Sequence, residues 1–224
     1  MNKEHFTWQR AIQHKPFLVH LLIAILLLVS LISIVPYFFN LIILHKPGIT
    51  LYDPVLAAFR VKDYSGLIFI LIYGALFFTI AANFNKPAVI IIGIEVYAVV
   101  NLIRLLAMYV YTLEAPHGII PLVDPIIERI VYGNTVFVKD LFFSGHVATL
   151  TVLVLIEPRR AFRMVKVLIT ILVALLILIQ HVHYTIDVAI APPVTYVVYR
   201  AFKIIHNRHF SDLIPSQKGD EKLT

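Results

Sequence analysis

Six long apolar segments divide this chain, and almost all of its charged residues lie in the short stretches between them. The segments run over residues 17–44, 64–82, 88–113, 141–157, 164–182 and 184–205. About 20 apolar residues in a helix cross the ~30 Å hydrocarbon core of a bilayer. The segments are continuously apolar and lack the period-two alternation of a membrane barrel. The predicted fold is therefore an all-α bundle of six transmembrane helices.

The composition agrees with an integral membrane protein. Of 224 residues, 60% are hydrophobic and 14% are charged, whereas soluble domains are about 45–50% apolar. The absence of cysteine excludes disulfides, thiolate metal sites and sulfur nucleophiles. The first apolar segment is too long for a signal peptide and is expected to stay as an anchor, with a kink near Pro36.

The basic residues predict an orientation. Thirteen of the 19 Lys and Arg residues fall in the termini and alternate loops of one side, which indicates that both termini are cytoplasmic. Topology explains the net charge of +6 better than a nucleic-acid partner does. Residues 1–205 are expected to form one transmembrane domain, with catalytic motifs within 97–200, and 206–224 a flexible cytoplasmic tail. The compact length and short loops favour a bacterial cytoplasmic membrane with an extracytoplasmic site.

Two polar motifs lie where apolar segments begin or end. They are Asp140-Leu-Phe-Phe-Ser-Gly-His146 and His181-Val-His-Tyr-Thr-Ile-Asp187. The predicted topology brings both motifs to the same outer membrane face. Placing ionisable groups at a membrane costs free energy, so the residues that carry them usually have a function. The polar residues of these two motifs are therefore candidate site residues.

His183 and Asp187 are four residues apart at the start of the last helix, so their side chains are predicted to touch. A carboxylate bonded to one imidazole nitrogen fixes the tautomer and makes the other nitrogen more basic. This pairing suits a nucleophilic or general-base histidine. The alternative is a helix cap or a purely structural pair.

Ser144-Gly145-His146 stands at the start of the fourth apolar segment. Ser144 is expected to cap the helix, and Gly145 to let an anion approach the helix N-terminus. His146 then projects from the first turn as a candidate acid. One histidine on either side of a phosphorus atom suggests phosphoryl transfer through a phosphohistidine.

These motifs resemble those of sphingomyelin synthases and their relatives, within the type 2 phosphatidic acid phosphatase superfamily. The similar segments are Ser144-Gly145-His146, His183-Tyr184-Thr-Ile-Asp187-Val, Asp140 and the stretch from Arg104 to Leu113. The resemblance covers about residues 97–200. It implies a triad in which His183 is the nucleophile, Asp187 orients it and His146 is the acid.

The resemblance also implies an activity. The expected enzyme moves a phospho-head group from a glycerophospholipid to a ceramide- or diacylglycerol-like alcohol within the bilayer, without a cofactor. The alternative is a lipid phosphate phosphatase that uses the same triad with water as acceptor. An ion or solute carrier with Arg104 and Glu95 inside the membrane is a third hypothesis.

This chain departs from the family pattern at several positions. Val138-Lys139 replaces Cys-Gly, Val147 replaces a threonine, Pro192-Pro193 stands near paired tyrosines, and a doubled arginine upstream of Arg104 is missing. The Lys-x6-Arg-Pro pattern of soluble phosphatases is also absent. A phosphate clamp is therefore expected from Lys139, Arg104 or Arg129.

Several other residues have two interpretations. Arg104 is placed about nine residues inside the third helix, where it either pairs with Glu95 or Glu114 or contacts a lipid phosphate. Glu95 is expected to join a hydrogen bond or ion pair between helices. Asp140 either caps the fourth helix or supports the site. Tyr109 and Tyr111 are candidate head-group contacts, and Tyr184 is a candidate for binding the substrate or supporting the site.

A metal site is the weaker interpretation of the histidines. His146, His181, His183 and Asp187 include zinc-type ligands, but His181 and His183 point about 200° apart on a helix. No metal site is therefore predicted. The expected partners are a phospholipid donor, a lipid alcohol acceptor and the bilayer.

Overall fold

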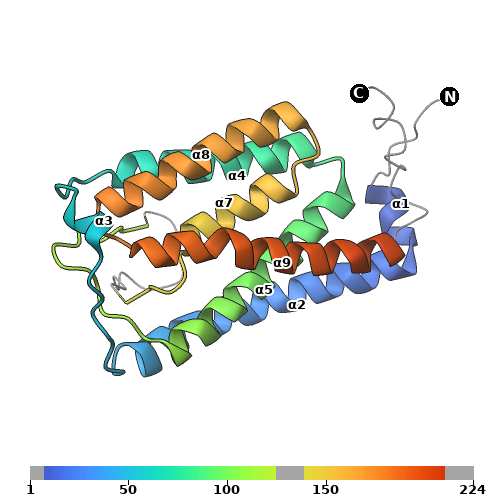
Figure 1. The fold of residues 1–224 in the computed structure, drawn as a ribbon. Coiled ribbons are helices and arrows are strands. Elements are labelled where there is room, and N and C mark those ends of the chain that lie inside the picture. Colours follow the sequence, from blue (N-terminus) through green and yellow to red (C-terminus); the bar gives the residue numbers. More distant parts are fainter. Residues whose placement is uncertain (1–7, 125–138, 210–224) are drawn as a thin grey trace.

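The computed structural model describes residues 8–124 and 139–209, and the described residues form a helical bundle (Figure 1). The elements are α1 (Trp8–Gln13), α2 (Lys15–Tyr37), the π-helix η1 (Phe38–Ile43), α3 (Pro54–Ala57), α4 (Ser65–Asn83), α5 (Pro87–Val110), α7 (Gly145–Leu155), α8 (Arg160–Ile179) and α9 (Thr185–His209). Within these residues the only β-type pairing is an isolated bridge between Ile49 and Leu113. The predicted all-α class is confirmed for the described part of the chain.

Five of the described helices are long and apolar enough to cross a membrane: α2 with η1, α4, α5, α8 and α9. The fourth predicted segment, 141–157, forms the shorter helix α7 of 11 residues, because Ser144 caps its start and the turn before Arg160 follows its end. At 1.5 Å per residue, α7 is about 16 Å long, roughly half the hydrocarbon thickness. The helical segment is therefore shorter than the sequence predicted.

The outward faces of the long helices are apolar. Leu26 of α2 and Ile70 of α4 are 67% and 70% exposed, and similar side chains cover the outside of α8. In water such a continuous apolar surface would be strongly unfavourable, whereas lipid tails solvate it. These faces agree with an integral membrane protein.

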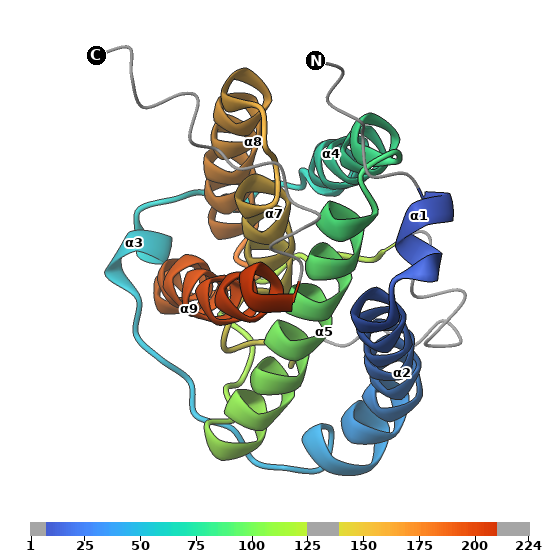
Figure 2. The ribbon, with the colours of Figure 1, turned by 90° about the vertical axis from the view of Figure 1, so that its right-hand side faces the viewer.

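The short helix α7 lies inside the bundle. It packs against α4, α5, α8 and α9, and in the end-on view it stands between them (Figure 2). Its residues Val147 and Leu150 belong to the main hydrophobic core together with Val96 and Val100 of α5. The first turn of α7 therefore lies in the interior of the bundle.

Two predicted irregularities take a definite form in the structure. After Pro36 the α-helix continues as the π-helical turn η1, a known way of relieving a helix interruption. The turn before the last helix forms because His181 takes a left-handed backbone conformation (φ 57°) and Val182 N–H donates to the carbonyl of Ile177. After this turn α9 packs against α7 and α5.

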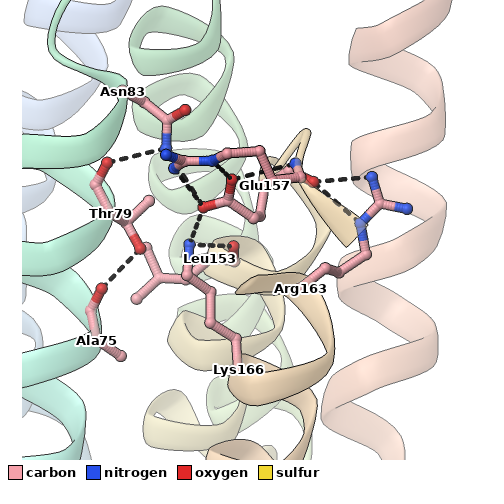
Figure 3. Close-up of polar contacts among 8 residues, drawn as sticks. Ala75, Thr79, Asn83, Leu153, Glu157, Arg163 and Lys166 are labelled. Carbon is pink, nitrogen blue, oxygen red and sulfur yellow. Dashed lines mark hydrogen bonds and ion pairs between the residues drawn. The ribbon is translucent and has the colours of Figure 1, made fainter. Parts of the chain in front are cut away.

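A buried polar cluster closes the bundle at the turn between α7 and α8 (Figure 3). The carboxylate of Glu157 accepts hydrogen bonds from Lys166 Nζ at 2.6 Å and Arg159 Nε at 2.8 Å, and Asn83 Nδ2 of α4 lies at 3.4 Å. Arg163 donates to the carbonyl of Glu157. Arg159, Arg163 and Lys166, which are among the basic residues that predict the orientation, therefore also hold α4, α7 and α8 together.

Candidate active site

Both histidine motifs lie at the end of the bundle where α7 and α9 begin, close to α3 (Figure 1). A main-chain hydrogen bond of 3.1 Å joins them, because Ser144 N–H donates to the carbonyl of Asp187. The Ser144 side chain accepts from Val147 N–H at 3.5 Å and caps α7 as predicted. Two segments about 40 residues apart in sequence are thus fixed to one another.

The structure brings His146 and His183 together. Their ring centroids are 6.2 Å apart and the rings meet edge to face. His183 is 1% exposed, and Nδ1 of His146 is buried without a hydrogen-bond partner among the described residues. At this separation one phosphoryl group can contact both imidazoles.

Asp187 lies next to the His183 ring. Its Oδ2 is 3.4 Å from His183 Nδ1 and accepts from Tyr184 N–H at 3.2 Å. Asp187 is fully buried, and its Oδ1 has no hydrogen-bond partner in the described part of the chain. A carboxylate beside Nδ1 favours the tautomer with the proton on Nδ1, which leaves the lone pair on Nε2.

Arg104 pairs with Asp140 and not with Glu95 or Glu114, the two partners expected from the sequence. Its guanidinium forms a short ion pair with the Asp140 carboxylate and donates from Nε to the carbonyl of Phe143 at 2.6 Å. The prediction that Asp140 caps the fourth helix is wrong, since Ser144 occupies the capping position. Arg104 also lies closer to the end of α5 than expected, about 9 Å before Val110.

Gly145 is the residue against which the Arg104 guanidinium packs. A Cβ atom at position 145 would lie 2.9 Å from Cζ and 3.0 Å from Nη1 of Arg104, both too close. Glycine therefore permits the close approach of a cation to the start of α7. The sequence suggested the approach of an anion to the same place, and a guanidinium in that position supports anion binding as well.

An apolar cavity of about 580 Å³ leads to this site. At one end it is lined by His146, Arg104 and Asp140. Beyond them it extends along α4, α5 and α7, with apolar residues such as Leu76, Leu153 and Ile156. Among the described residues that line it, Arg104 is the only lysine or arginine.

Two of the other predicted contacts lie apart from the histidine pair. Lys139 Nζ forms a 2.7 Å ion pair with Glu114, and this hydrogen bond holds the pKa of Glu114 below its ordinary value. Tyr109 is half exposed, and the ammonium group of Lys46 stands 4.2 Å above its ring. Neither Lys139 nor Tyr109 lines the cavity, and Arg129 lies outside the described residues.

Tyr184 supports the site from behind. Its hydroxyl donates to the carbonyl of Glu114 at 3.1 Å and accepts from Leu51 N–H at 3.2 Å. Burial raises the pKa of its phenol. Tyr184 thus ties the 46–53 loop to the start of α9.

The sequence analysis missed two carboxylates near the site. Asp53 accepts from Thr185 N–H at 2.6 Å and from its hydroxyl at 3.0 Å, so a distant loop caps α9. Burial raises the pKa of Asp53, but these hydrogen bonds outweigh burial and lower it overall. Asp124 lines the cavity and accepts from the Tyr73 hydroxyl at 2.7 and 2.9 Å. Neither contact has a local sequence signal, because each partner is more than 50 residues away.

His181 stands outside the histidine pair. Nδ1 lies 3.0 Å from the carbonyl of His117, and Nε2 lies 3.0 Å from the carbonyl of Leu56. Both ring nitrogens are therefore engaged with the main chain of two loops. His181 is therefore not available as a zinc ligand beside His183.

Comparison with known families points in the same direction as this geometry. No curated protein matches the chain. Residues 139–206, which contain His146, His183 and Asp187, match a family model described as PAP2 superfamily C-terminal. This PAP2 domain supports a function of the lipid phosphatase or phosphotransferase type in a protein with several membrane-spanning helices.

Proposed function

We propose that the protein is a membrane lipid phosphotransferase that moves a phospho-head group from a glycerophospholipid to a ceramide- or diacylglycerol-like alcohol. One observation carries this proposal. His146 lines an apolar cavity together with Arg104, and its ring centroid lies 6.2 Å from that of His183, which is buried next to it and does not itself line the cavity. An apolar cavity suits a lipid tail, and the two imidazoles suit transfer of the phosphorus group.

The first step forms a phosphohistidine. Nε2 of His183 attacks phosphorus, and the bond from phosphorus to the glycerol oxygen breaks. Protonated His146 gives its proton to the leaving diacylglycerol oxygen. Asp187, within 3.4 Å of His183 Nδ1, stabilises the positive charge that develops on the ring.

The second step reverses these roles. Neutral His146 takes the proton from the acceptor hydroxyl, whose oxygen attacks phosphorus while the bond to His183 Nε2 breaks. The free imidazole of His183 and a protonated His146 are restored. One acid–base residue thus serves both half-reactions, because the second step is the chemical reverse of the first with a different alcohol.

Arg104 is the proposed phosphate contact, with Ser144 and Gly145 placing the start of α7 beside it. Its pairing with Asp140 fixes the guanidinium and lowers the net positive charge of the pocket. Asp124 adds a second carboxylate. A phosphodiester with one negative charge and a cationic head group fits this balance better than a doubly charged phosphate monoester.

The second candidate function is a lipid phosphate phosphatase. The PAP2 match across residues 139–206 supports this function as well, because it is compatible with phosphatase and phosphotransferase chemistry alike. The same triad would then pass the group to water and release inorganic phosphate.

The proposal includes an arrangement in the membrane. α7 acts as a short sixth crossing inside the bundle, both termini face the cytoplasm, and the histidine pair opens to the extracytoplasmic side of a bacterial cytoplasmic membrane. The predicted tail of residues 206–224 begins later than expected, because α9 continues to His209, and residues 210–224 lie outside the described part of the chain. The basic residues near Lys86 and Arg159 support this orientation.

A lipid-transfer assay tests the function. The purified protein is incubated with vesicles that contain head-group-labelled phospholipid, with and without ceramide or diacylglycerol. We expect label in a new phospholipid only when the alcohol is present. Release of inorganic phosphate from phosphatidate without any new phospholipid would favour the phosphatase.

Triad variants test the residues. We expect His183→Ala, His146→Ala and Asp187→Asn each to lower turnover at least about 100-fold, because each removes the nucleophile, the acid or the orienting carboxylate. His45→Ala, an exposed histidine, is the control and keeps full turnover. Full activity of His183→Ala would refute the nucleophile assignment.

A further inference from the structure

A second cluster of buried ionisable residues lies at the opposite end of the bundle from the histidine pair. It consists of His20 near the start of α2, Glu95 near the start of α5 and His206 near the end of α9. All three are at least nine-tenths buried, and Glu95 is fully buried. Three helices that are far apart in sequence thus contribute one side chain each.

The side chains point their polar atoms at one another. His20 Nδ1 is 2.8 Å from Glu95 Oε1, and His206 Nε2 is 2.5 Å from Glu95 Oε2. The two imidazole rings lie 4.5 Å apart between centroids. The candidate ligand atoms of all three residues fall within 4.8 Å of one another.

The charge of this cluster needs a cation. An ionised carboxylate in a membrane interior is expensive unless it is paired. Both partners of the Glu95 carboxylate described above are imidazoles, which are neutral unless they gain a proton. Either a proton on one ring or a bound metal ion therefore compensates the charge.

We propose that His20, Glu95 and His206 form a zinc-binding site. Two imidazole nitrogens and one carboxylate oxygen are a typical zinc ligand set, with a fourth position left for water. Tetrahedral bonds of about 2.0–2.1 Å put donor atoms about 3.4 Å apart. The contacts of 2.5 and 2.8 Å described above are shorter than this value, and all candidate ligand atoms lie within 4.8 Å of one another, so small side-chain rotations bring the three donors to this spacing.

His209 supports the site from outside. Its Nδ1 lies 2.9 Å from Nε2 of His20, so the His20 ring is held with Nδ1 toward Glu95. A partner on the second nitrogen orients a histidine ligand and increases its basicity. His209 is exposed at the end of α9, which gives the ion a route from the aqueous side.

The site fastens α2 to the catalytic bundle. α2 packs against α5, and α5 packs against α9, so one ion would join all three helices. Glu95 and Arg104 are nine residues apart on α5, about 13 Å along the helix axis. The zinc site is therefore separate from the proposed phosphotransfer site, and either proposal can fail without the other.

Direct metal measurements test the proposal. The full chain is purified in detergent without chelator and without a histidine tag, and its zinc content is measured by mass spectrometry. We expect about one zinc per chain. After removal of the metal, Co²⁺ titration should produce the intense visible absorption of a tetrahedral site at one equivalent, and Zn²⁺ should displace it and raise the unfolding temperature. Absence of both metal and the Co²⁺ spectrum in the wild type would overturn the proposal.

Variants separate the zinc site from other histidines. Glu95→Gln and His206→Ala should lose the Co²⁺ spectrum, and His209→Ala should weaken binding by about 10–100-fold. His45→Ala is exposed and should bind like the wild type. Equal binding by Glu95→Gln and wild type would refute the site, as would an unfolding temperature of the wild type that zinc does not change. Since the wild-type titration carries the test, a variant that fails to fold leaves the result intact.

Discussion

At the scale of single residues, the most informative contact is the packing of Arg104 against Gly145. The guanidinium is fixed by Asp140 and Phe143, and its position leaves no room for a Cβ atom at residue 145. His146 is the next residue, so a displaced guanidinium would also disturb the proposed acid. The absence of a side chain at Gly145 thus connects the proposed phosphate contact to the proposed catalytic histidine.

Gly145→Ala tests this contact. The added methyl group must displace the guanidinium, and overpacking of this kind costs about 1–3 kcal/mol. We expect a lower unfolding temperature and a loss of turnover of about tenfold or more. Both are measured by thermal unfolding in detergent and by the lipid-transfer assay.

Gly74→Ala is the matched control. A Cβ atom at Gly74 meets nothing within 4 Å, and alanine favours the helix. This variant should be as stable as the wild type or slightly more so, with full turnover. Equal unfolding temperatures and turnover of the two alanine variants would show that the Arg104 guanidinium moves aside without a loss of stability or activity.

At the scale of elements, α7 is a short helix held at both ends. Its start is tied to α9 through the hydrogen bond from Ser144 to Asp187. Its end runs into Glu157, which Lys166 and Arg159 hold in place (Figure 3). The position of His146 in the bundle therefore depends on contacts at both ends of the helix.

Glu157→Gln should destabilise the bundle. It leaves Lys166, which is 2% exposed, buried without its carboxylate, and breaking a buried pair in this way costs about 3–5 kcal/mol. Glu114→Gln is the control, because its pair with Lys139 is partly exposed and is expected to contribute about 0–1 kcal/mol. Thermal unfolding of both variants gives the comparison, and similar losses would contradict the buried pair.

The same residue predicts a pH dependence. Burial raises the pKa of Glu157, but the hydrogen bonds from Arg159 and Lys166 outweigh it and lower the pKa from 4.5 to about 2. The stability from this carboxylate is present above about pH 4.5 and is lost as the pH falls toward 2. The unfolding temperature of the wild type should therefore fall more steeply over this interval than that of Glu157→Gln. Parallel curves would argue against the shift.

At the scale of the whole molecule, the bundle has two polar ends. The histidine pair and the Asp53 cap lie at the end where α9 begins. The cluster of His20, Glu95 and His206 lies where α9 ends. The proposed orientation exposes the first end to the outside and the second to the cytoplasm.

Cysteine labelling tests this orientation, because the chain contains no cysteine. Tyr52→Cys lies in the exposed loop before α3, and Asn207→Cys lies in the exposed end of α9. In sealed right-side-out vesicles, a membrane-impermeant maleimide should label Tyr52→Cys and spare Asn207→Cys until the membrane is dissolved. The cysteine-free wild type is the blank, and the reverse pattern would invert the topology.

The sequence alone was sufficient to predict the all-α class, most helix boundaries to within a few residues, and the proximity of His146 to His183. The helix class and boundaries follow from apolar length and from helix periodicity, which are local properties, whereas the proximity of the two histidines was predicted from the membrane topology. The contact of His183 with Asp187 was also predicted, although His183 lies two residues before α9 and is not part of the helix.

Only the tertiary structure decided the pairing of charges and the length of the fourth apolar segment as a helix. Arg104 pairs with Asp140 rather than Glu95 or Glu114, Glu95 pairs with two histidines, and Asp53 caps a helix that begins 132 residues later. Each of these partners is chosen by how helices pack, because a buried charge takes whichever opposite group the fold brings within reach. Apolar periodicity predicts which face of a helix is buried, but not which residue of a neighbouring helix contacts that face.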